Sequence, residues 1–241
     1  MSSLAAARLR ARIYLALFVP LTFSLAAVAI VGTWFDASGR LYAAFARFWS
    51  RTSLAMARVR VTVQGAEHLP GGPVIFMSNH QSNFDILALL AWMPRQIHMI
   101  AKKELFEIPV FGASMRRGGY IPLDRSDGRK ALKSMDNAAG IIRGGKSVVM
   151  FPEGTRSPDR RLLPFKRGGF MLAVRAGVPV VPVTVNGSGR INPPNRIELY
   201  RGDITLTIHP PVSVPDGMPR SEAESYLMER VHAAISSNLE Q

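Results

Sequence analysis

The chain has 241 residues, of which 47% are hydrophobic, with no cysteine and a formal net charge of +13. This length and composition suit one substantial globular domain and exclude a disordered or low-complexity protein. The lack of cysteine excludes disulfides, thiolate metal sites and a covalent thioester on the protein. The charge predicts anionic partners, either nucleic acid, anionic lipid or phosphorylated small molecules, without choosing among them.

An uncharged apolar segment stands near the N-terminus, from Ile13 to Phe35. As a helix that rises about 1.5 Å per residue, it would be roughly 34 Å long and could cross a bilayer. It is longer than the apolar region of a signal peptide and lacks a convincing cleavage site. We therefore predict that it contacts a membrane, with a buried core helix as the alternative.

A basic stretch follows this segment. Spacings of seven, four and seven residues place Arg40, Arg47, Arg51 and Arg58 on one side of a helix. The pattern predicts a helical hairpin, in which the apolar helix enters the membrane and the basic amphipathic helix lies along its surface after a turn near residues 32–39. A single span followed by a solvated basic helix is the alternative.

Arginines flank both ends of the apolar segment, and this distribution predicts that both ends face the cytoplasm. We therefore expect a protein of the inner (plasma) membrane whose remaining chain lies at the cytoplasmic face. The predicted division is a membrane-associated helical segment over residues 1–58 and an α/β domain over residues 59–241.

Short β-branched runs punctuate the rest of the chain and predict strands, with helical patterns between them. The last helix is expected to open with a capping box from Ser221 to Glu224. Because strands and helices alternate, we predict an α/β fold with a mixed, partly parallel sheet covered by helices. The predicted strands are 59–63, 73–77, 97–101, 120–123, 147–151, 178–185 and 203–208, and the predicted helices are 84–93, 128–143, 166–176 and 222–239.

Three polar clusters each follow a predicted strand. They read "SNHQSNFD" after strand 73–77, "DR" after strand 120–123 and "PEGTRS" after strand 147–151. Functional sites of parallel α/β sheets gather at the carboxyl ends of the strands. If these strands run parallel, the three loops are therefore expected to share one edge of the sheet.

In the first cluster, His80 stands five residues before Asp85. On one continuous helix the two side chains would lie about 140° apart and could not touch. If the helix begins at Ser82 or Asn83, His80 stays on the loop and can fold back onto Asp85 in the first turn. Such a pair is typical of a general base with an orienting carboxylate. The alternative is an Asp85 that only caps the helix beside an ordinary loop histidine.

The third cluster predicts a tight turn that binds substrate. Gly154 allows the backbone to approach a ligand, and Arg156 offers the planar guanidinium that suits phosphate. Two more cations end neighbouring strands, and with Arg156 they would bind a phosphate monoester. Each of them could instead be a surface charge paired with an acid. The predicted substrate-binding residues are Lys102, Arg125, Glu153, Gly154, Thr155 and Arg156.

Taken together, these blocks resemble the ordered motifs of the glycerophospholipid acyltransferase family. The matching stretches are "NHQSNFD", "KKELFEIPVFG", "GGYIPLDR", "FPEGTRS" and "VPVVPV", and they cover roughly residues 60–210. The 1-acyl-glycerol-3-phosphate acyltransferase branch is the most similar. The resemblance implies that His80 and Asp85 are the catalytic pair and that the second and third motifs bind glycerol phosphate.

This resemblance also implies an activity, which is transfer of a fatty acyl group from acyl-CoA or acyl carrier protein to lysophosphatidic acid, giving phosphatidic acid. His80 would deprotonate the acceptor hydroxyl in a direct transfer without an acyl-enzyme, which suits a chain that lacks cysteine. Backbone N–H groups near Gly154 or Ser82 would hold the oxyanion. No metal, no separate cofactor and no nucleic acid are expected.

Other functions stay open at this point. The same fold could acylate another lysolipid or an aminolipid, or His80 could activate water and hydrolyse a thioester. A non-enzymatic module that binds anionic lipid would fit the charge of +13 but would leave the spacing of His80 and Asp85 unexplained.

Overall fold

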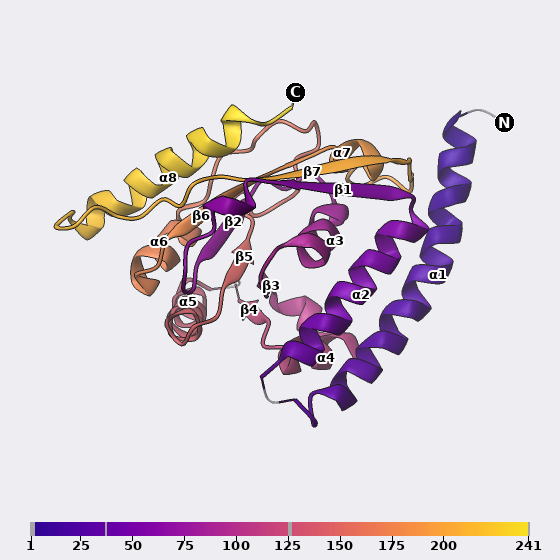
Figure 1. Ribbon diagram of the computed structural model, residues 1–241, viewed down its shortest axis with the longest axis horizontal. Coiled ribbons are helices and arrows are strands. Elements are labelled where there is room, and N and C mark those ends of the chain that lie inside the picture. The colour runs from indigo at the N-terminus through magenta and orange to yellow at the C-terminus, as the bar shows by residue number, and fades with distance from the viewer. Residues whose placement is uncertain (1–2, 37, 125–126, 241) are drawn as a thin grey trace.

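A seven-stranded sheet organises the described part of the chain, which comprises residues 3–36, 38–124 and 127–240 of this computed structural model (Figure 1). Its strands are β1 (Val59–Gln64), β2 (Ile75–Ser78), β3 (His98–Lys102), β4 (Ile121–Leu123), β5 (Val148–Met150), β6 (Val180–Asn186) and β7 (Gly202–Ile208). The spatial order is β1-β7-β6-β2-β5-β3-β4. Each strand begins and ends within two residues of its predicted position, so all seven predictions are confirmed.

The sheet is mixed and mostly parallel, as predicted. The neighbours β6, β2, β5, β3 and β4 run parallel in succession, and β1 runs parallel to β7. The only change of direction among the described strand pairs falls between β6 and β7, which are antiparallel. The carboxyl ends of five neighbouring strands therefore meet at one edge.

The helices are α1 (Ser3–Gly32), α2 (Arg40–Met56), α3 (Asn83–Trp92), α4 (Phe111–Arg117), α5 (Gly128–Arg143), α6 (Arg167–Ala176), α7 (Ser188–Ile191) and α8 (Arg220–Ser237), with 3₁₀ turns η1 (Ala66–His68) and η2 (Lys103–Glu107). The four helices predicted between and after the strands are confirmed as α3, α5, α6 and α8. Helix α4 was not predicted because its seven residues are too few to show an apolar period.

The predicted capping box at the start of α8 is wrong. The helix begins at Arg220 after Pro219, and no side chain caps its first turn. Glu224 lies in the second turn and accepts a hydrogen bond of 3.0 Å from Arg167 of α6. A tertiary ion pair therefore takes the carboxylate that the local pattern assigned to the cap.

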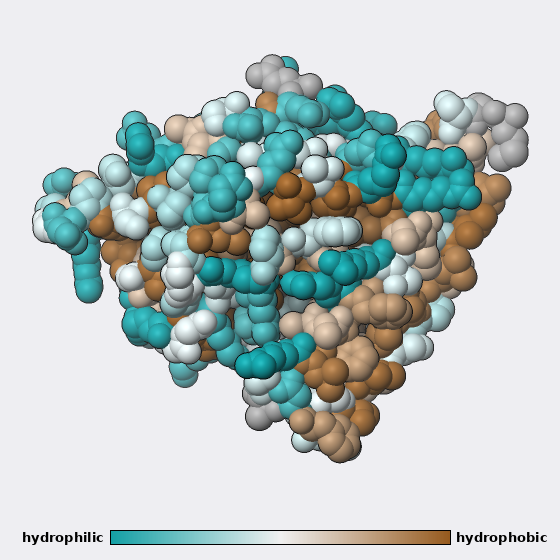
Figure 2. Space-filling model, in the orientation of Figure 1, coloured by the Kyte–Doolittle hydropathy of each residue, from teal (hydrophilic) through white to brown (hydrophobic). Residues whose placement is uncertain are grey.

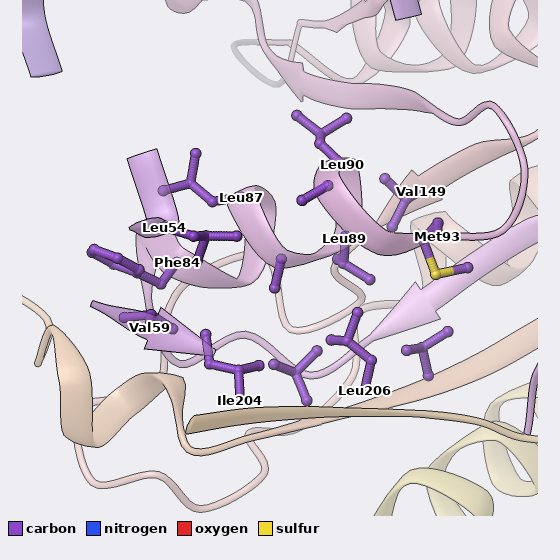
Figure 3. Packing of buried hydrophobic residues seen from close by; sticks show 14 of the residues in the cluster. Leu54, Val59, Phe84, Leu87, Leu89, Leu90, Met93, Val149, Ile204 and Leu206 are labelled. Carbon is purple, nitrogen blue, oxygen red and sulfur yellow. The ribbon is translucent and has the colours of Figure 1, made fainter. Parts of the chain in front are cut away.

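Both faces of the sheet are covered because the buried strands alternate their side chains between the two faces. Phe76 belongs to the core under α3, whereas its neighbours Ile75 and Met77 belong to the core under α5, α6 and α8. Figure 3 shows the first core, where side chains of α3 such as Leu87 and Leu89 pack over Ile204 of β7. This packing fixes α3, and with it the loop that precedes α3.

The two N-terminal helices form a hairpin, as predicted, in which α1 ends at Gly32 and α2 begins at Arg40 (Figure 1). Helix α2 packs against α3, and Arg47 and Arg51 donate hydrogen bonds to the carbonyls of Met93 (3.0 Å) and Ala91 (3.2 Å). Cations are favoured there by the negative end of the helix dipole. These bonds anchor α2 to α3, and the prediction that the basic side of α2 lies along the membrane stays a prediction.

Helix α1 lies along the α/β part and contacts it near both ends. Near its start, the backbone N–H of Leu199 donates to the carbonyl of Ala7 (3.2 Å), and Arg10 donates to the carbonyl of Leu199 (3.1 Å). Just beyond its end, the guanidinium of Arg117 lies 5.7 Å from the ring centre of Trp34. A single span would carry the two ends of α1 to opposite sides of a bilayer, so contacts of this kind are those expected of the hairpin, while the position of α1 in a membrane stays a prediction.

The outer side of α1 is apolar and exposed. Figure 2 shows hydrophobic surface along the edge that α1 and α2 occupy in Figure 1. Among the described residues, α1 is the one helix that is long and apolar enough to cross a membrane, by length and composition alone. Exposed hydrophobic side chains in and just after it include Ile13, Leu17, Val28, Val31, Trp34 and Phe35.

Candidate active site

The loops after β2 and β5 meet at the carboxyl edge of the sheet, as predicted from the parallel arrangement. The strands are direct neighbours, and hydrogen bonds join the loops that follow them, including one of 2.9 Å from Gln81 Nε2 to the carbonyl of Arg160. The backbone N–H of Ser157 donates to the carbonyl of His80 (2.7 Å), and the N–H of His80 donates to Glu153 Oε1 (2.6 Å). The "NHQSNFD" and "FPEGTRS" motifs therefore form one site.

His80 and Asp85 form the predicted pair, at a distance of 2.7 Å between His80 Nδ1 and Asp85 Oδ2. Helix α3 begins after the N-cap Ser82, whose side chain accepts from the N–H of Phe84. His80 thus stays on the loop and Asp85 falls in the first turn. The N–H groups of Gln81 (2.7 Å) and Ser82 (2.9 Å) also donate to Asp85 Oδ2. Asp85 does cap α3, but it does not only cap it, because the same carboxylate also holds the ring of His80.

The orientation of the imidazole ring follows from these contacts. Because an ionised carboxylate only accepts hydrogen bonds, Nδ1 of His80 carries the proton and Nε2 has the free lone pair. The plane of the imidazole ring is fixed by stacking on the ring of Phe151, with 3.8 Å between the ring centroids and an interplanar angle of 12°. The His80 side chain is 13% exposed, whereas Asp85 is fully buried. The geometry is that of a general base held by an acid.

Glu153 is buried, and its two carboxylate oxygens accept from the backbone of two loops. In addition to the bond from His80, Oε2 accepts from the N–H of Leu163 at 2.9 Å. Burial raises the pKa of Glu153 to about 7, although both N–H donors act in the opposite direction. These contacts are those of a side chain that positions His80, while its predicted role in substrate binding stays a prediction.

The raised pKa of Glu153 predicts a pH-dependent stability. The folded protein holds this proton to higher pH than the unfolded chain, whose pKa is about 4.5. The stability from this proton is therefore complete below about pH 4.5 and is lost as the pH rises through about 7. The Glu153→Gln variant lacks the titration, so its deficit in free energy of unfolding relative to the wild type is expected to shrink between pH 5 and pH 8, as measured by urea denaturation. An identical deficit at both pH values would contradict the assignment.

Gly154 and Arg156 lie in the turn after Glu153. Gly154 has a φ of +74° and donates its N–H to the carbonyl of Phe151 (3.0 Å). A β-carbon on Gly154 would lie 3.0 Å from Nζ of Lys166, so the lysine lies directly over the glycine backbone. Arg156 donates to Asn83 Oδ1 (3.2 Å) at the start of α3. Both cations are thus close to the loop that carries the candidate base.

Lys166 is a site residue that the sequence reasoning missed. Its approach to Gly154 is set by a hydrogen bond of 2.8 Å from its own backbone N–H to the carbonyl of Pro152, which is distant in sequence. A lysine beside an arginine, twelve residues after Gly154, gives no local signal of that contact. Only the folded loop brings the ammonium to the turn.

The other predicted substrate-binding residues are less closely placed. Lys102 is exposed at the end of β3, and it is the neighbouring Lys103 that forms an ion pair with Asp124, at 3.3 Å. Thr155 is exposed in the turn. Arg125 lies outside the described residues. Substrate binding by these three residues stays a prediction.

The two amides expected to hold an oxyanion are both engaged. The N–H of Ser82 donates to Asp85, and the N–H of Gly154 donates to Phe151. In both cases the acceptor lies only three residues away along the chain, so each tight turn binds its own N–H group. The expectation covered N–H groups near these two positions rather than these two amides alone, so the donors of an oxyanion hole stay a prediction.

An apolar groove of about 770 Å³ lies between α1 and the α/β part, beside this site. Phe18 of α1 and Phe84 of α3 are among its apolar lining residues, and Asn83 and Arg156 are among its polar ones. A second apolar cavity, of about 120 Å³, adjoins this groove, and the two share lining residues, including Trp49. A long hydrocarbon chain fits such surfaces.

The described residues contain no group of three His, Asp or Glu side chains that could hold a metal ion. The titratable and charged side chains gathered at this edge include the imidazole of His80, the carboxylates of Asp85 and Glu153, and the cations of Arg156 and Lys166.

Comparison with known proteins connects this geometry with a family. The sequence model of a family described as Acyltransferase matches residues 60–186. The chain is 40% identical over 170 residues to 1-acyl-sn-glycerol-3-phosphate acyltransferase BAT2, chloroplastic, of Brassica napus, covering 69% of this chain and 49% of that protein. It is 33% identical over 196 residues to the 1-acyl-sn-glycerol-3-phosphate acyltransferase of Pseudomonas aeruginosa, covering 79% and 75%.

The fold agrees with these matches. The crystal structure of the 1-acyl-sn-glycerophosphate (LPA) acyltransferase PlsC from Thermotoga maritima superposes with a TM-score of 0.79 at 25% identity, covering 97% of this chain and 98% of that chain. The chain spans about half the length of the first two plant relatives that it matches. The chain belongs to the acyltransferase family, of the 1-acyl-sn-glycerol-3-phosphate acyltransferase type, which confirms the resemblance inferred from its motifs.

Proposed function

We propose that the protein transfers a fatty acyl group from an acyl thioester to the free hydroxyl of 1-acyl-glycerol-3-phosphate, giving phosphatidic acid. The observation that carries this proposal is the bond between His80 Nδ1 and Asp85, which leaves Nε2 as a base beside a groove that suits lipid. The names of its relatives support the substrate. The activity, the donor and the mechanism are all part of the proposal.

The transfer is direct. Nε2 of His80 removes the proton of the acceptor hydroxyl as its oxygen attacks the thioester carbonyl, and Asp85 stabilises the imidazolium that forms. The carbon–sulfur bond then breaks, and the leaving thiolate takes the proton from the imidazolium. No acyl-enzyme is needed, and the chain has no cysteine to form one. General-base catalysis of this kind contributes roughly 10²–10⁴-fold to the rate.

The acyl donor is acyl-CoA or acyl carrier protein, and the same thioester chemistry serves both. The cavity of about 120 Å³ is lined mainly by apolar side chains such as Leu25, Ile86 and Met115, which suits the hydrocarbon part of a fatty acyl chain. Trp49 also lines it, and Nε1 of Trp49 donates to Thr22 Oγ1 (2.9 Å) between α2 and α1.

The experiment that tests this function uses one labelled acyl thioester with purified protein in detergent. A panel of acceptors separates acylation of lysophosphatidic acid from acylation of another lysolipid or an aminolipid. Labelled phosphatidic acid is the expected product. Labelled free fatty acid, formed at the same rate with or without acceptor, would identify a thioester hydrolase and refute the proposal.

Arg156 is proposed to bind the acceptor phosphate. An Arg156→Ala variant should raise the KM for lysophosphatidic acid by about 10-fold or more, because a charge-assisted hydrogen bond is worth roughly 1.5–3 kcal/mol. Turnover at saturating acceptor should change much less, since Nε2 of His80 is untouched. Initial rates against acceptor concentration measure both quantities. A fall in kcat at an unchanged KM would contradict the binding role.

The protein is proposed to act at the cytoplasmic face of the inner membrane, with the exposed apolar side of α1 immersed in one leaflet. Both ends of α1 contact the α/β part, so the helix can enter the bilayer lengthwise without carrying its N-terminus across. This position would also open the apolar groove toward lipid. Leu17 (54% exposed) and Val31 (47% exposed) lie on the side concerned.

A polarity-sensitive dye on a single introduced cysteine tests this placement, because the natural chain has no cysteine. A dye on Leu17→Cys is expected to shift its emission to the blue when phosphatidylglycerol vesicles are added. A dye on Leu132→Cys, on α5, is the matched control, since Leu132 is also exposed (42%) but lies on a helix that packs in the other core from α1. Equal shifts at the two positions would contradict immersion through α1.

A further inference from the structure

A third loop borders the apolar groove, in addition to the two loops of the predicted motifs. It comprises residues 192–199, after α7, and its base is closed by a bond of 3.1 Å from the side-chain amide of Asn192 to the carbonyl of Glu198. The hydroxyl of Ser82 donates to the carbonyl of Asn192 (3.0 Å). The N-cap of α3, which positions the candidate base, thus also holds this loop.

The same loop is fastened on its other side to α1. The N–H and the carbonyl of Leu199 both bond to the first turns of that helix, at Ala7 and Arg10. Two consecutive prolines, Pro193 and Pro194, restrict the backbone further. A side chain at the tip of this loop is therefore presented from a fixed frame.

Arg196 stands at that tip and is exposed. Among the described residues, no ion pair or side-chain hydrogen bond engages its guanidinium. The acid two residues away, Glu198, is buried, and it lies 4.0 Å from Arg8 and accepts from the hydroxyl of Tyr200 (3.1 Å). Arg196 therefore keeps an unneutralised charge.

Arg196 and Arg156 line the same groove, together with Asn83. They come from different loops, after α7 and after β5, and most of the remaining groove wall is apolar. A ligand that satisfies this surface has a hydrocarbon chain and an anionic head that accepts from two guanidinium groups. A phosphate monoester carries about −1.5 to −2 charges at neutral pH and has three acceptor oxygens, so it suits two guanidinium groups that line one groove.

We propose that Arg196 and Arg156 together bind the phosphate of the acceptor lysolipid, whose hydrocarbon chain lies in the groove along α1. The inference rests on the proposed function and adds a specificity residue outside the recognised motifs. A zwitterionic lysolipid, with a phosphodiester and a quaternary amine, gains less from the second guanidinium. Arg196 thus selects acceptors with a terminal phosphate.

The test is the Arg196→Gln variant, with initial rates in neutral detergent micelles at a fixed acyl-CoA concentration. The KM for lysophosphatidic acid is expected to rise about 10-fold, with kcat within about twofold of the wild type. The preference for lysophosphatidic acid over lysophosphatidylcholine is expected to fall by a similar factor. Arg196→Lys should recover part of the loss, because it keeps the charge but not the planar fork.

Arg201→Gln is the matched control, since Arg201 is exposed, is five residues away and does not line the groove. An unchanged KM in Arg196→Gln, or an equal rise in Arg201→Gln, would overturn the inference. Sedimentation with phosphatidylglycerol vesicles covers the other anionic ligand. If Arg196→Gln weakens vesicle binding at an unchanged KM, the cation serves a bilayer lipid and the inference fails.

Failure of this inference can be distinguished from failure of the proposed function. If the wild type makes no phosphatidic acid from any thioester, the function itself is refuted. If the wild type acylates lysophosphatidic acid while Arg196→Gln keeps its KM and its acceptor preference, only the role of Arg196 is refuted.

Discussion

Replacing His80 with alanine is expected to lower kcat by about 10²–10⁴-fold while the protein still binds lysolipid. The substitution removes the proton acceptor, whereas the backbone N–H of residue 80 still donates to Glu153 and keeps the loop in place. Turnover is measured as labelled phosphatidic acid, and lysolipid binding by calorimetry in detergent.

The control for this variant is His232→Ala. His232 lies on the exposed side of α8, where its ring contacts Phe165 and its nitrogen approaches Ser236, so the same change is made outside the site. It should leave turnover unchanged. Wild-type turnover in His80→Ala would refute the assignment of the base, and a joint loss of binding and turnover would point to a misfolded loop.

An Asp85→Asn variant is expected to fold normally and to lose about 10²–10⁴-fold in kcat. Asparagine still offers an oxygen to the N–H groups of Gln81 and Ser82, so the cap of α3 survives. The negative charge that stabilises the imidazolium of His80 is lost. Asp85→Ala should in addition destabilise the fold by roughly 1–3 kcal/mol, because buried donors then lose their acceptor.

Thermal unfolding and kcat of the two variants separate the structural and catalytic roles of this carboxylate. Asp203→Asn is the matched control, since Asp203 forms an exposed ion pair with Arg60 (2.8 Å) between β7 and β1. Its loss should change stability little, because solvent screens an exposed ion pair, and it should leave kcat unchanged. An Asp85→Asn variant with wild-type kcat would show that Asp85 is only a helix cap.

The two substitutions of Asp85 test whether one carboxylate both orients His80 and caps α3. One carboxylate oxygen accepts from the ring of His80 and from two backbone amides at the start of α3. The same helix is locked by the core beneath it, so the base is oriented by the fold rather than by a flexible side chain (Figure 3). Catalytic geometry held in this way keeps the near-attack position without further ordering.

Much of the fold was readable in the amino-acid order because it depends on near neighbours. Alternating β-branched runs give strands, and the strand–helix alternation makes the sheet mostly parallel, so the loops after β2 and β5 had to share an edge. The interval from His80 to Asp85 specified its own geometry as well. An N-cap at Ser82 is a local event, and it places the two side chains face to face.

Other features depend on contacts between residues far apart in the chain, and no local pattern carries them. Arg47 and Arg51 donate to carbonyls at the C-terminus of α3, which need donors, and the spacing of these arginines in the sequence did not predict that contact. Glu224 was expected in a capping box and instead pairs with Arg167. In each case a polar side chain binds a partner that is far away in the sequence, because helix packing brings that partner close.

The interval of five residues between His80 and Asp85 thus determined how these two side chains meet. The groove and the cations beside it depend instead on the assembled fold. Lys166 reaches Gly154 through a backbone bond to Pro152, and Arg196 reaches the groove on a loop tied to α1 and to α3. The bond and the capping that join His80 to Asp85 act within one turn of chain, whereas Glu153 and Phe151 hold His80 from the loop after β5. The groove exists only where α1 packs on α3 and on residues 192–199, which the chain brings together from widely separated positions.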